Sequence, residues 1–151
     1  LELQKKWFDA IFHGARDAIF IATEQALFVN CNRAAEILTG YSLDELHSMT
    51  IQDLHETEDL DAFNKFFSRI MSGEDITSEA KILRKDGSKI PVEFSNKSLE
   101  IDGHRYMHTI ARDISKRKLE EEKLTGAKRI TGNYSRTLPL EYSRLILREM
   151  P

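Results

Sequence analysis

Hydrophobic residues at the start of the chain recur every three to four positions, which is the period of an amphipathic helix. The apolar stripe of this segment consists of Leu3, Trp7, Phe8, Ile11 and Phe12. The pattern predicts a helix over residues 1–14 that ends near Gly14. Two short apolar runs follow, at residues 17–22 and 26–29, and they predict a β-hairpin whose turn lacks the usual glycine.

Helical spacing returns in the middle of the chain, with clear start and stop signals. Residues 32–38 are followed by Gly40, which is typical of a helix C-terminus. Ser42 with Glu45 three residues later forms a capping-box pattern and predicts the start of a short helix. A longer helix is predicted over residues 58–71, where one stripe carries Leu60, Phe63, Phe66, Phe67 and Ile70.

From residue 78 the apolar period shortens to two, which indicates β-strands. Runs at 78–83 and 90–95 flank an Asp-Gly turn signal, and a second Asp-Gly pair leads into a third run at 106–111. After it, Ser115 is a candidate N-cap for a charged helix that ends near residue 126. The order of helix, two strands, several helices, three strands and helix predicts an α+β fold with helices on one face of an antiparallel sheet.

Composition limits what the chain can do. Its 151 residues, 40% hydrophobic, suffice for one domain, and 22 basic against 25 acidic residues argue against a nucleic-acid partner. Cys31 is the single cysteine, which excludes an internal disulfide and any cysteine-based zinc site. No apolar run approaches the roughly 20 residues that span a bilayer, so we expect no direct membrane insertion and a cytoplasmic location, with any membrane anchor elsewhere in a longer parent. Because the sequence begins at Leu1 rather than Met, we expect a fragment of such a parent.

Several short motifs occur in a specific order along residues 5–124. The N-terminal set is Phe28-Val29-Asn30, Ala34-Ala35, Leu38-Thr39-Gly40-Tyr41-Ser42 and Glu45-Leu46. The C-terminal set is Arg84-Lys85-Asp86-Gly87-Ser88, Pro91-Val92-Glu93 and Arg112-Asp113-Ile114-Ser115-Lys116-Arg117-Lys118. In this order the motifs resemble the PAS family, including its C-terminal exit motif, the PAC motif.

The resemblance implies a PAS fold, in which a five-stranded antiparallel sheet curls over helices on one face and encloses a small pocket. It divides the chain into an N-terminal amphipathic helix (1–14), a PAS core (15–115), an output linker helix (116–126) and a tail of unknown role (127–151). Thr137-Leu138-Pro139 could open a short helix in that tail. The implied function is a signal-sensing and dimerisation input domain of a bacterial signal-transduction protein, with a two-component sensor histidine kinase favoured as the parent.

Three groups of residues carry this expected function. Candidates for the pocket lining are Ile19, Ile21, Leu38, Leu54, Phe63, Phe67, Ile70, Ile82, Val92, Phe94, Met107, Thr109 and Ala111. The expected signal exit is Arg112, Asp113, Ile114 and Ser115, where side-chain bonds to backbone amides would fix the angle of the output helix. The outer face of the last strand carries Tyr106, His108 and Ile110, and we expect the helix bearing Trp7, Phe8, Ile11 and Phe12 to cover it, from the same subunit or from the second subunit of a homodimer.

The sequence disfavours haem and flavin, two cofactors of PAS-like sensors. Haem-binding members have a histidine on the long helix; the matching position is near Ala62, and His55, which we expect in a solvated loop, lies before that helix. Light-oxygen-voltage members need a reactive cysteine where this chain has residues 49–54. Their flavin-bonding positions correspond to Ile82, Val92 and Ala111, which cannot pair with a flavin ring edge. We therefore expect no tight cofactor, with a small hydrophobic ligand as the open possibility.

The sequence contains no catalytic or metal-binding motif. Phosphate-binding glycine loops, nucleophile elbows and zinc-binding His-Glu-x-x-His helices are absent, and His104 and His108 would lie about 13 Å apart in a strand. Any enzymatic activity is therefore expected in a covalently linked effector domain. Two alternatives remain open: a haem- or flavin-based redox or gas sensor, and a ligand-free dimerisation module of a diguanylate cyclase or transcription regulator.

Overall fold

Two separate stretches of the chain supply the five antiparallel strands of a single sheet. The computed structural model describes residues 2–56 and 60–128, so nearly all of the predicted tail lies outside the described residues. The strands are β1 (Ala18–Ala22), β2 (Phe28–Cys31), β3 (Ile76–Leu83), β4 (Lys89–Ile101) and β5 (His104–Asp113). Their order is β2-β1-β5-β4-β3, so the last strand lies in the middle of the sheet and joins the two hairpins.

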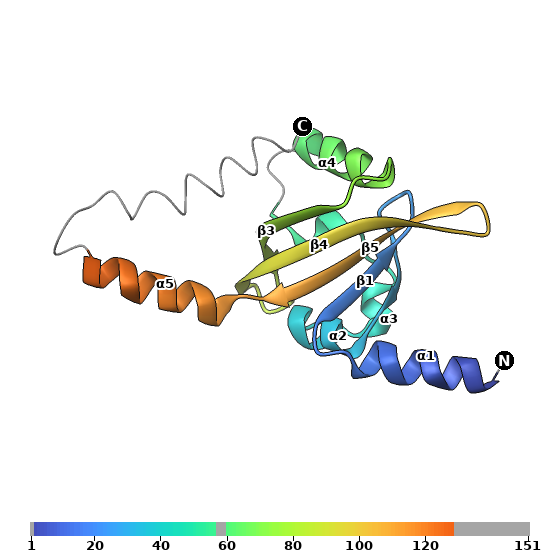
Figure 1. Cartoon of the computed structure of the whole chain (residues 1–151), viewed down its shortest axis with the longest axis horizontal. Helices are drawn as coiled ribbons and strands as arrows, with labels where there is room; N and C mark the ends of the chain where they lie inside the picture. The colour runs from blue at the N-terminus through green and yellow to red at the C-terminus, as the bar shows by residue number, and fades with distance from the viewer. Residues whose placement is uncertain (1, 57–59, 129–151) are drawn as a thin grey trace.

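The helices lie between the two hairpins and at the two ends. They are α1 (Glu2–Gly14), α2 (Arg33–Thr39), α3 (Leu43–Leu46), the 3-10 helix η1 (Ile51–Leu54), α4 (Leu60–Met71) and α5 (Ser115–Lys128). Figure 1 looks onto the sheet with α2 and α3 behind it, while α1 and α5 extend from opposite sides of the core. None of the described helices is long and apolar enough to cross a bilayer. The predicted α+β architecture is confirmed.

Local hydrogen bonds explain why the middle helices begin and end where they do. The backbone N–H of Ala35 donates to the side chain of Asn32, which caps α2, and Gly40 ends this helix with a left-handed φ of 80°. Ser42 and Glu45 make the two reciprocal bonds of a capping box at the start of α3. The predicted helix end at Gly40 and the predicted Ser42–Glu45 capping box are confirmed, and the Asn32 cap is an additional finding of the structure.

The first hairpin turns without a glycine because Ala26 takes the unusual conformation itself. Its φ is 63°, in the left-handed region that a non-glycine residue adopts at a cost. The hydroxyl oxygen of Thr23 accepts hydrogen bonds from the backbone N–H groups of Gln25 and Leu27, and the Ala26 side chain is buried. Side-chain bonding and burial therefore offset the strain of this turn.

The structure corrects the predicted orientation of β1. The buried residues of this strand are Ala18, Phe20 and Ala22, whereas Ile19 and Ile21 are half-buried on the opposite face. Ile19 pairs with Ile110 and Ile21 with His108, so both isoleucines belong to the outer face of the sheet. Both faces of β1 are apolar, and the aromatic ring of Phe20 takes the interior position.

The last two strands and the last helix are longer than the sequence pattern predicts. β4 and β5 pair without interruption from Val92 and Asp113 to Ile101 and His104, so their far end projects beyond the other strands and α4 as a two-stranded ribbon (Figure 1). Main-chain bonds continue there although the apolar alternation has ended. α5 ends at Lys128, two residues after the predicted end near residue 126.

Candidate signal-input core and exit turn

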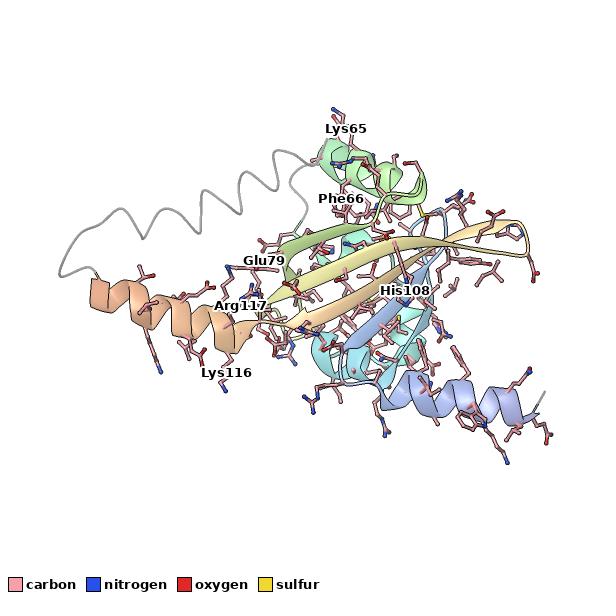
Figure 2. All side chains as sticks on the ribbon, in the orientation of Figure 1. Lys65, Phe66, Glu79, His108, Lys116 and Arg117 are labelled. Carbon is pink, nitrogen blue, oxygen red and sulfur yellow. The ribbon has the colours of Figure 1, made fainter. Side chains whose placement is uncertain are left out.

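The inner face of the sheet and the helices behind it form one hydrophobic core. From the strands, the predicted residues Ile82, Val92, Phe94, Met107, Thr109 and Ala111 are all buried. From the helices, Leu38, Leu54 and Ile70 are buried, and Phe63 and Phe67 are partly buried and stack with ring centroids 5.9 Å apart. Figure 2 shows Phe66 pointing from α4 towards the strands and Lys65 pointing away. The burial of these residues agrees with the prediction. Their role as the lining of a ligand pocket remains a prediction.

A buried polar pair interrupts this apolar core. The hydroxyl of Thr109 donates to Oδ1 of Asn96 at 2.8 Å, and Nδ2 of Asn96 donates to the backbone oxygen of Ile76 at 3.1 Å. Both side chains are buried, together with Ser78. The prediction included Thr109 but missed Asn96, although it continues the alternate series Ile90, Val92, Phe94 by one more inward step. Because buried polar groups are costly unless they are paired, this pair fixes the register of β4 against β5.

The 3-10 helix contributes a second polar feature on the helical side. Oε1 of Gln52 is buried without a hydrogen-bond partner among the described residues. It is an acceptor that a donor group could satisfy, and its flanking residues Ile51 and Leu54 are both buried.

His55 is not the solvated loop histidine that the sequence predicts. Its ring lies 5.6 Å from the ring of the buried Phe94, centroid to centroid, and it forms a hydrogen bond with the backbone of Lys81 on β3. Burial lowers the pKa of His55, and the bond to Lys81 offsets part of this effect. The neighbouring Glu56 pairs with Lys89 at 2.6 Å, so this segment is fastened to the β3–β4 hairpin.

The chain leaves the sheet through a short turn whose central residue is buried. Ile114 is 5% exposed, and its backbone N–H donates to the oxygen of Pro91 on β4 at 3.1 Å. A carboxylate oxygen of Asp113 accepts from the backbone N–H of Ser115 at 2.8 Å. Ser115 is therefore the first residue of α5 rather than its cap, and the capping bond comes from Asp113. Arg112 pairs with Asp17 at 3.3 Å on the outside of the turn.

Comparison with known proteins agrees with this arrangement. A family model described as PAS fold matches residues 7–114. The chain belongs to the PAS family.

Three solved structures illustrate the similarity. A domain of the sensory box sensor histidine kinase/response regulator from Geobacter sulfurreducens is 28% identical, with a TM-score of 0.65 over 74% of this chain and 96% of that one. The PAS domain of an HTR-like protein from Haloarcula marismortui is 22% identical, with a TM-score of 0.69 over 75% and 93%. An RNA-binding light-oxygen-voltage receptor is 24% identical, with a TM-score of 0.69 over 82% of this chain and 36% of that one. None of the curated proteins matches.

The N-terminal motif of this PAS domain is organised around one fully buried asparagine. Nδ2 of Asn32 donates to the backbone oxygens of Phe12 and Asp17, both at 3.0 Å. Its Oδ1 accepts from the backbone N–H groups of Ile19 at 2.9 Å and Ala35 at 3.0 Å. One side chain thus joins the end of α1, the start of β1 and the first turn of α2.

The C-terminal motif holds the β3–β4 hairpin against the helices. Nε of Arg84 donates to the backbone oxygen of Leu38 at 3.0 Å, and the backbone N–H of Lys85 donates to that of Thr39 at 3.0 Å. These bonds satisfy carbonyl groups that the end of α2 leaves unpaired. Nζ of Lys85 also lies 2.7 Å from a carboxylate oxygen of Glu45 on α3. The residues of this motif are therefore explained by packing between hairpin and helices.

The side chains of this PAS domain fit neither haem nor flavin well. α4 contains no histidine, and the His55 ring is already engaged with β3 and Phe94. At the positions expected to bond a flavin, Ile82, Val92 and Ala111 are buried and have no polar side-chain atoms. Cys31 is fully buried, and burial raises the pKa of its thiol to about 12, so it is not a reactive thiolate. Among the described residues no cluster of three or more His, Cys, Asp or Glu side chains could hold a metal ion.

The N-terminal helix does not cover the sheet of its own chain. Trp7, Phe8 and Ile11 are 63%, 48% and 67% exposed, and only Phe12 is buried at the end of the helix. We define the outer patch as the half-buried side chains on the open face of β1, β4 and β5: Ile19, Ile21, Leu99, Tyr106, His108 and Ile110. Figure 2 shows His108 on this face. The prediction that α1 covers the outer face of the sheet within the same subunit is therefore wrong.

Proposed function

We propose that this PAS domain is the signal-sensing and dimerisation input domain of a bacterial sensor histidine kinase. The observation that carries the proposal is the exit turn: β5 lies in the centre of the sheet, and the buried Ile114 connects it directly to α5. A displacement of β5 is therefore transmitted to the output helix through a short, hydrogen-bonded link. The similarity to a domain of a sensor histidine kinase/response regulator supports this choice of parent.

The core is proposed to respond to a small, mainly apolar molecule rather than to haem or flavin. Its lining is apolar, and the Thr109–Asn96 pair and the Oε1 atom of Gln52 supply the few polar points that orient a ligand in such sites. The chemistry of phosphotransfer would belong to a covalently linked effector, and we place the domain in the cytoplasm of the cell.

A second copy of the chain is the proposed partner for α1. The helix presents exposed apolar side chains, and the outer patch offers an apolar face that its own α1 leaves open. Burial of a large apolar side chain contributes roughly 1.5–3 kcal/mol, so the three exposed residues of each subunit favour association. Phe12 is held by Asn32, which gives α1 a defined direction from the core.

Native mass spectrometry of the chain tests the sensing and dimerisation proposals together. We expect a dimer, and a retained small-molecule mass would identify the ligand class. The double variant Trp7→Ser/Ile11→Ser is expected to be monomeric at concentrations where wild type is dimeric. The control is Ile37→Ser on α2, which removes a side chain 71% exposed and should leave the dimer intact. A monomeric wild type, or a dimer that survives the double substitution, would contradict the proposed interface.

The exit turn is tested in the parent protein by its kinase activity. Asp113→Ala removes the acceptor for the Ser115 N–H and is expected to change the response to the signal, whereas Asp113→Asn keeps an acceptor oxygen and should preserve it. An unchanged response in Asp113→Ala would refute coupling through this turn.

A further inference from the structure

The output helix has a first turn that is electrostatically unfavourable by itself. Lys116, Arg117 and Lys118 follow directly after Ser115, so three cations occupy the end of the helix where the dipole favours anions. Burial gives little compensation, since Leu119 and Leu124 are 52% and 58% exposed. A helix of 14 residues is marginal in isolation. The stability of α5 must therefore depend on contacts with the rest of the domain.

An equally unfavourable arrangement lies on the nearby edge of the sheet. Glu79 on β3 and Glu93 on β4 are directly opposite each other in the strand register. Their side chains are 23% and 31% exposed, on the outer face. Like charges in directly opposite positions destabilise a strand pair unless a cation lies between them.

The two unfavourable clusters neutralise each other. The Arg117 guanidinium pairs with Glu79 and lies 3.6 Å from a carboxylate oxygen of Glu93. Nζ of Lys118 lies 3.0 Å from the second oxygen of Glu79, and Glu121 approaches both cations at 3.7 and 3.6 Å. Figure 2 shows Arg117 close to Glu79, while Lys116 extends from the other side of α5. We call Glu79, Glu93, Arg117 and Lys118 the ionic clamp.

We infer that the ionic clamp is a docking site for the output helix, which makes the position of α5 depend on β3 and β4 as well as on the exit turn of β5. Glu93 lies between Val92 and Phe94, whose side chains are buried in the core. Glu79 likewise lies between the buried Ser78 and the half-buried Ala80. A molecule that displaces either strand from the inside therefore moves a carboxylate of the clamp on the outside.

The direction of the pKa shift of Glu79 is consistent with a formed clamp. Burial raises its pKa, but the hydrogen bond from Lys118 and the charges of Lys118 and Arg117 outweigh this effect and hold the pKa below its usual value. Each pair is partly exposed, so each contributes modestly and is sensitive to salt. This modest strength suits a helix that must dock and release.

Hydrogen exchange of the α5 amides in the 151-residue chain, followed by NMR, tests the clamp directly. Glu79→Gln and Arg117→Gln are each expected to accelerate exchange at residues 119–125 by about threefold. The double variant should exchange faster than either single variant, but by less than the product of the two single effects, because both substitutions remove the Arg117–Glu79 pair. Raising the salt concentration to about 1 M should accelerate exchange in wild type by a similar factor and have a smaller effect in Glu79→Gln, which keeps, of the clamp, only the Arg117–Glu93 pair between α5 and the sheet.

Lys116→Gln is the matched control. It removes a cation from the same helical turn, so the dipole alone predicts unchanged or slower exchange for both Lys116→Gln and Arg117→Gln. The clamp predicts opposite effects for these two variants. Equal behaviour of the two, or exchange in Glu79→Gln that matches wild type, would overturn the inference.

A role of the clamp in signal output rests on the proposed function. Kinase activity of the parent protein, measured separately, distinguishes failure of the clamp from failure of the proposed function. In the parent protein, Glu79→Gln is expected to alter basal kinase activity at least twofold while Lys116→Gln leaves it unchanged. Faster exchange in the isolated chain with unaltered kinase activity would keep the docking contact and reject its role in output. Parent protein without kinase activity would reject the proposed function and leave the exchange result standing.

Discussion

Replacement of Asn32 is the most informative test of how this PAS domain is held together. The side chain makes four hydrogen bonds to backbone groups of three elements. Loss of the helix cap alone costs about 1 kcal/mol. Loss of the other three bonds leaves the backbone oxygens of Phe12 and Asp17 and the backbone N–H of Ile19 without a partner. Each unpaired group costs about 1 kcal/mol of stability. Asn32→Ala should therefore lower the free energy of unfolding by about 3–4 kcal/mol, a large share of the roughly 5–15 kcal/mol typical of a domain.

Urea denaturation followed by circular dichroism measures this loss, and Asn32→Ser separates its parts. Serine is a good helix cap but cannot reach Phe12 and Asp17 with a donor, so this variant should recover only about 1 kcal/mol of the loss. Asn64→Ala, on the exposed side of α4, serves as the control and should change stability by less than about 0.5 kcal/mol. If Asn32→Ser were as stable as wild type, capping would be the whole role of Asn32, and its proposed link between α1, β1 and α2 would be refuted.

Two further predictions concern the half-buried His55 and the buried Thr109–Asn96 pair. Because burial lowers the pKa of His55 in the folded state, the unfolded state binds a proton first as pH falls through about 6.5, so stability should be full above that pH and decrease below it. His55→Gln should reduce this decrease between pH 7 and 5.5, as measured by urea denaturation. The control His47→Gln, at an exposed position, should not reduce it. Equal pH profiles for wild type and His55→Gln would contradict the assignment of this pH dependence to His55. Thr109→Val should cost about 1–2 kcal/mol because it leaves the Asn96 oxygen unpaired, whereas adding Asn96→Leu should restore part of that loss. Strictly additive costs in the double variant would rule out a coupled pair.

The features that the sequence predicts well are those set by neighbouring residues. Gly40 and the Ser42–Glu45 capping box act within four residues of their own position, so their patterns remain visible without tertiary structure. The same holds for the Asp86-Gly87 turn, where the Asp86 carboxylate accepts from the backbone N–H of Ser88 at 2.9 Å. These local signals mark the end of α2, the start of α3 and the turn between β3 and β4.

The features that the sequence does not predict depend on contacts between distant segments. Period-two alternation divides the side chains of β1 between two faces but does not show which face is inside when both are apolar. The sequence-based prediction therefore has Ile19 and Ile21 on the wrong face. By residue type alone, Asn96 is predicted on the surface. Its burial depends on the hydrogen bond with Thr109 of β5. His55 is likewise half-buried only because β3 and Phe94 fold against it. In each case the missing information is the identity of a partner at least 13 residues away.

The distribution of contacts indicates where a signal can leave this domain. Continuous main-chain pairing unites all five strands, and such a unit opens only at a high free-energy cost. The two end helices are attached differently: α1 is held at its last turn by Phe12 and Asn32, and α5 by the exit turn and the ionic clamp. Both helices keep large apolar side chains exposed. They therefore bury the most apolar surface when a new partner binds, and they break few existing contacts when they move. A change in the core should therefore appear as a change in the direction of α1 and α5 rather than in the pairing of the sheet.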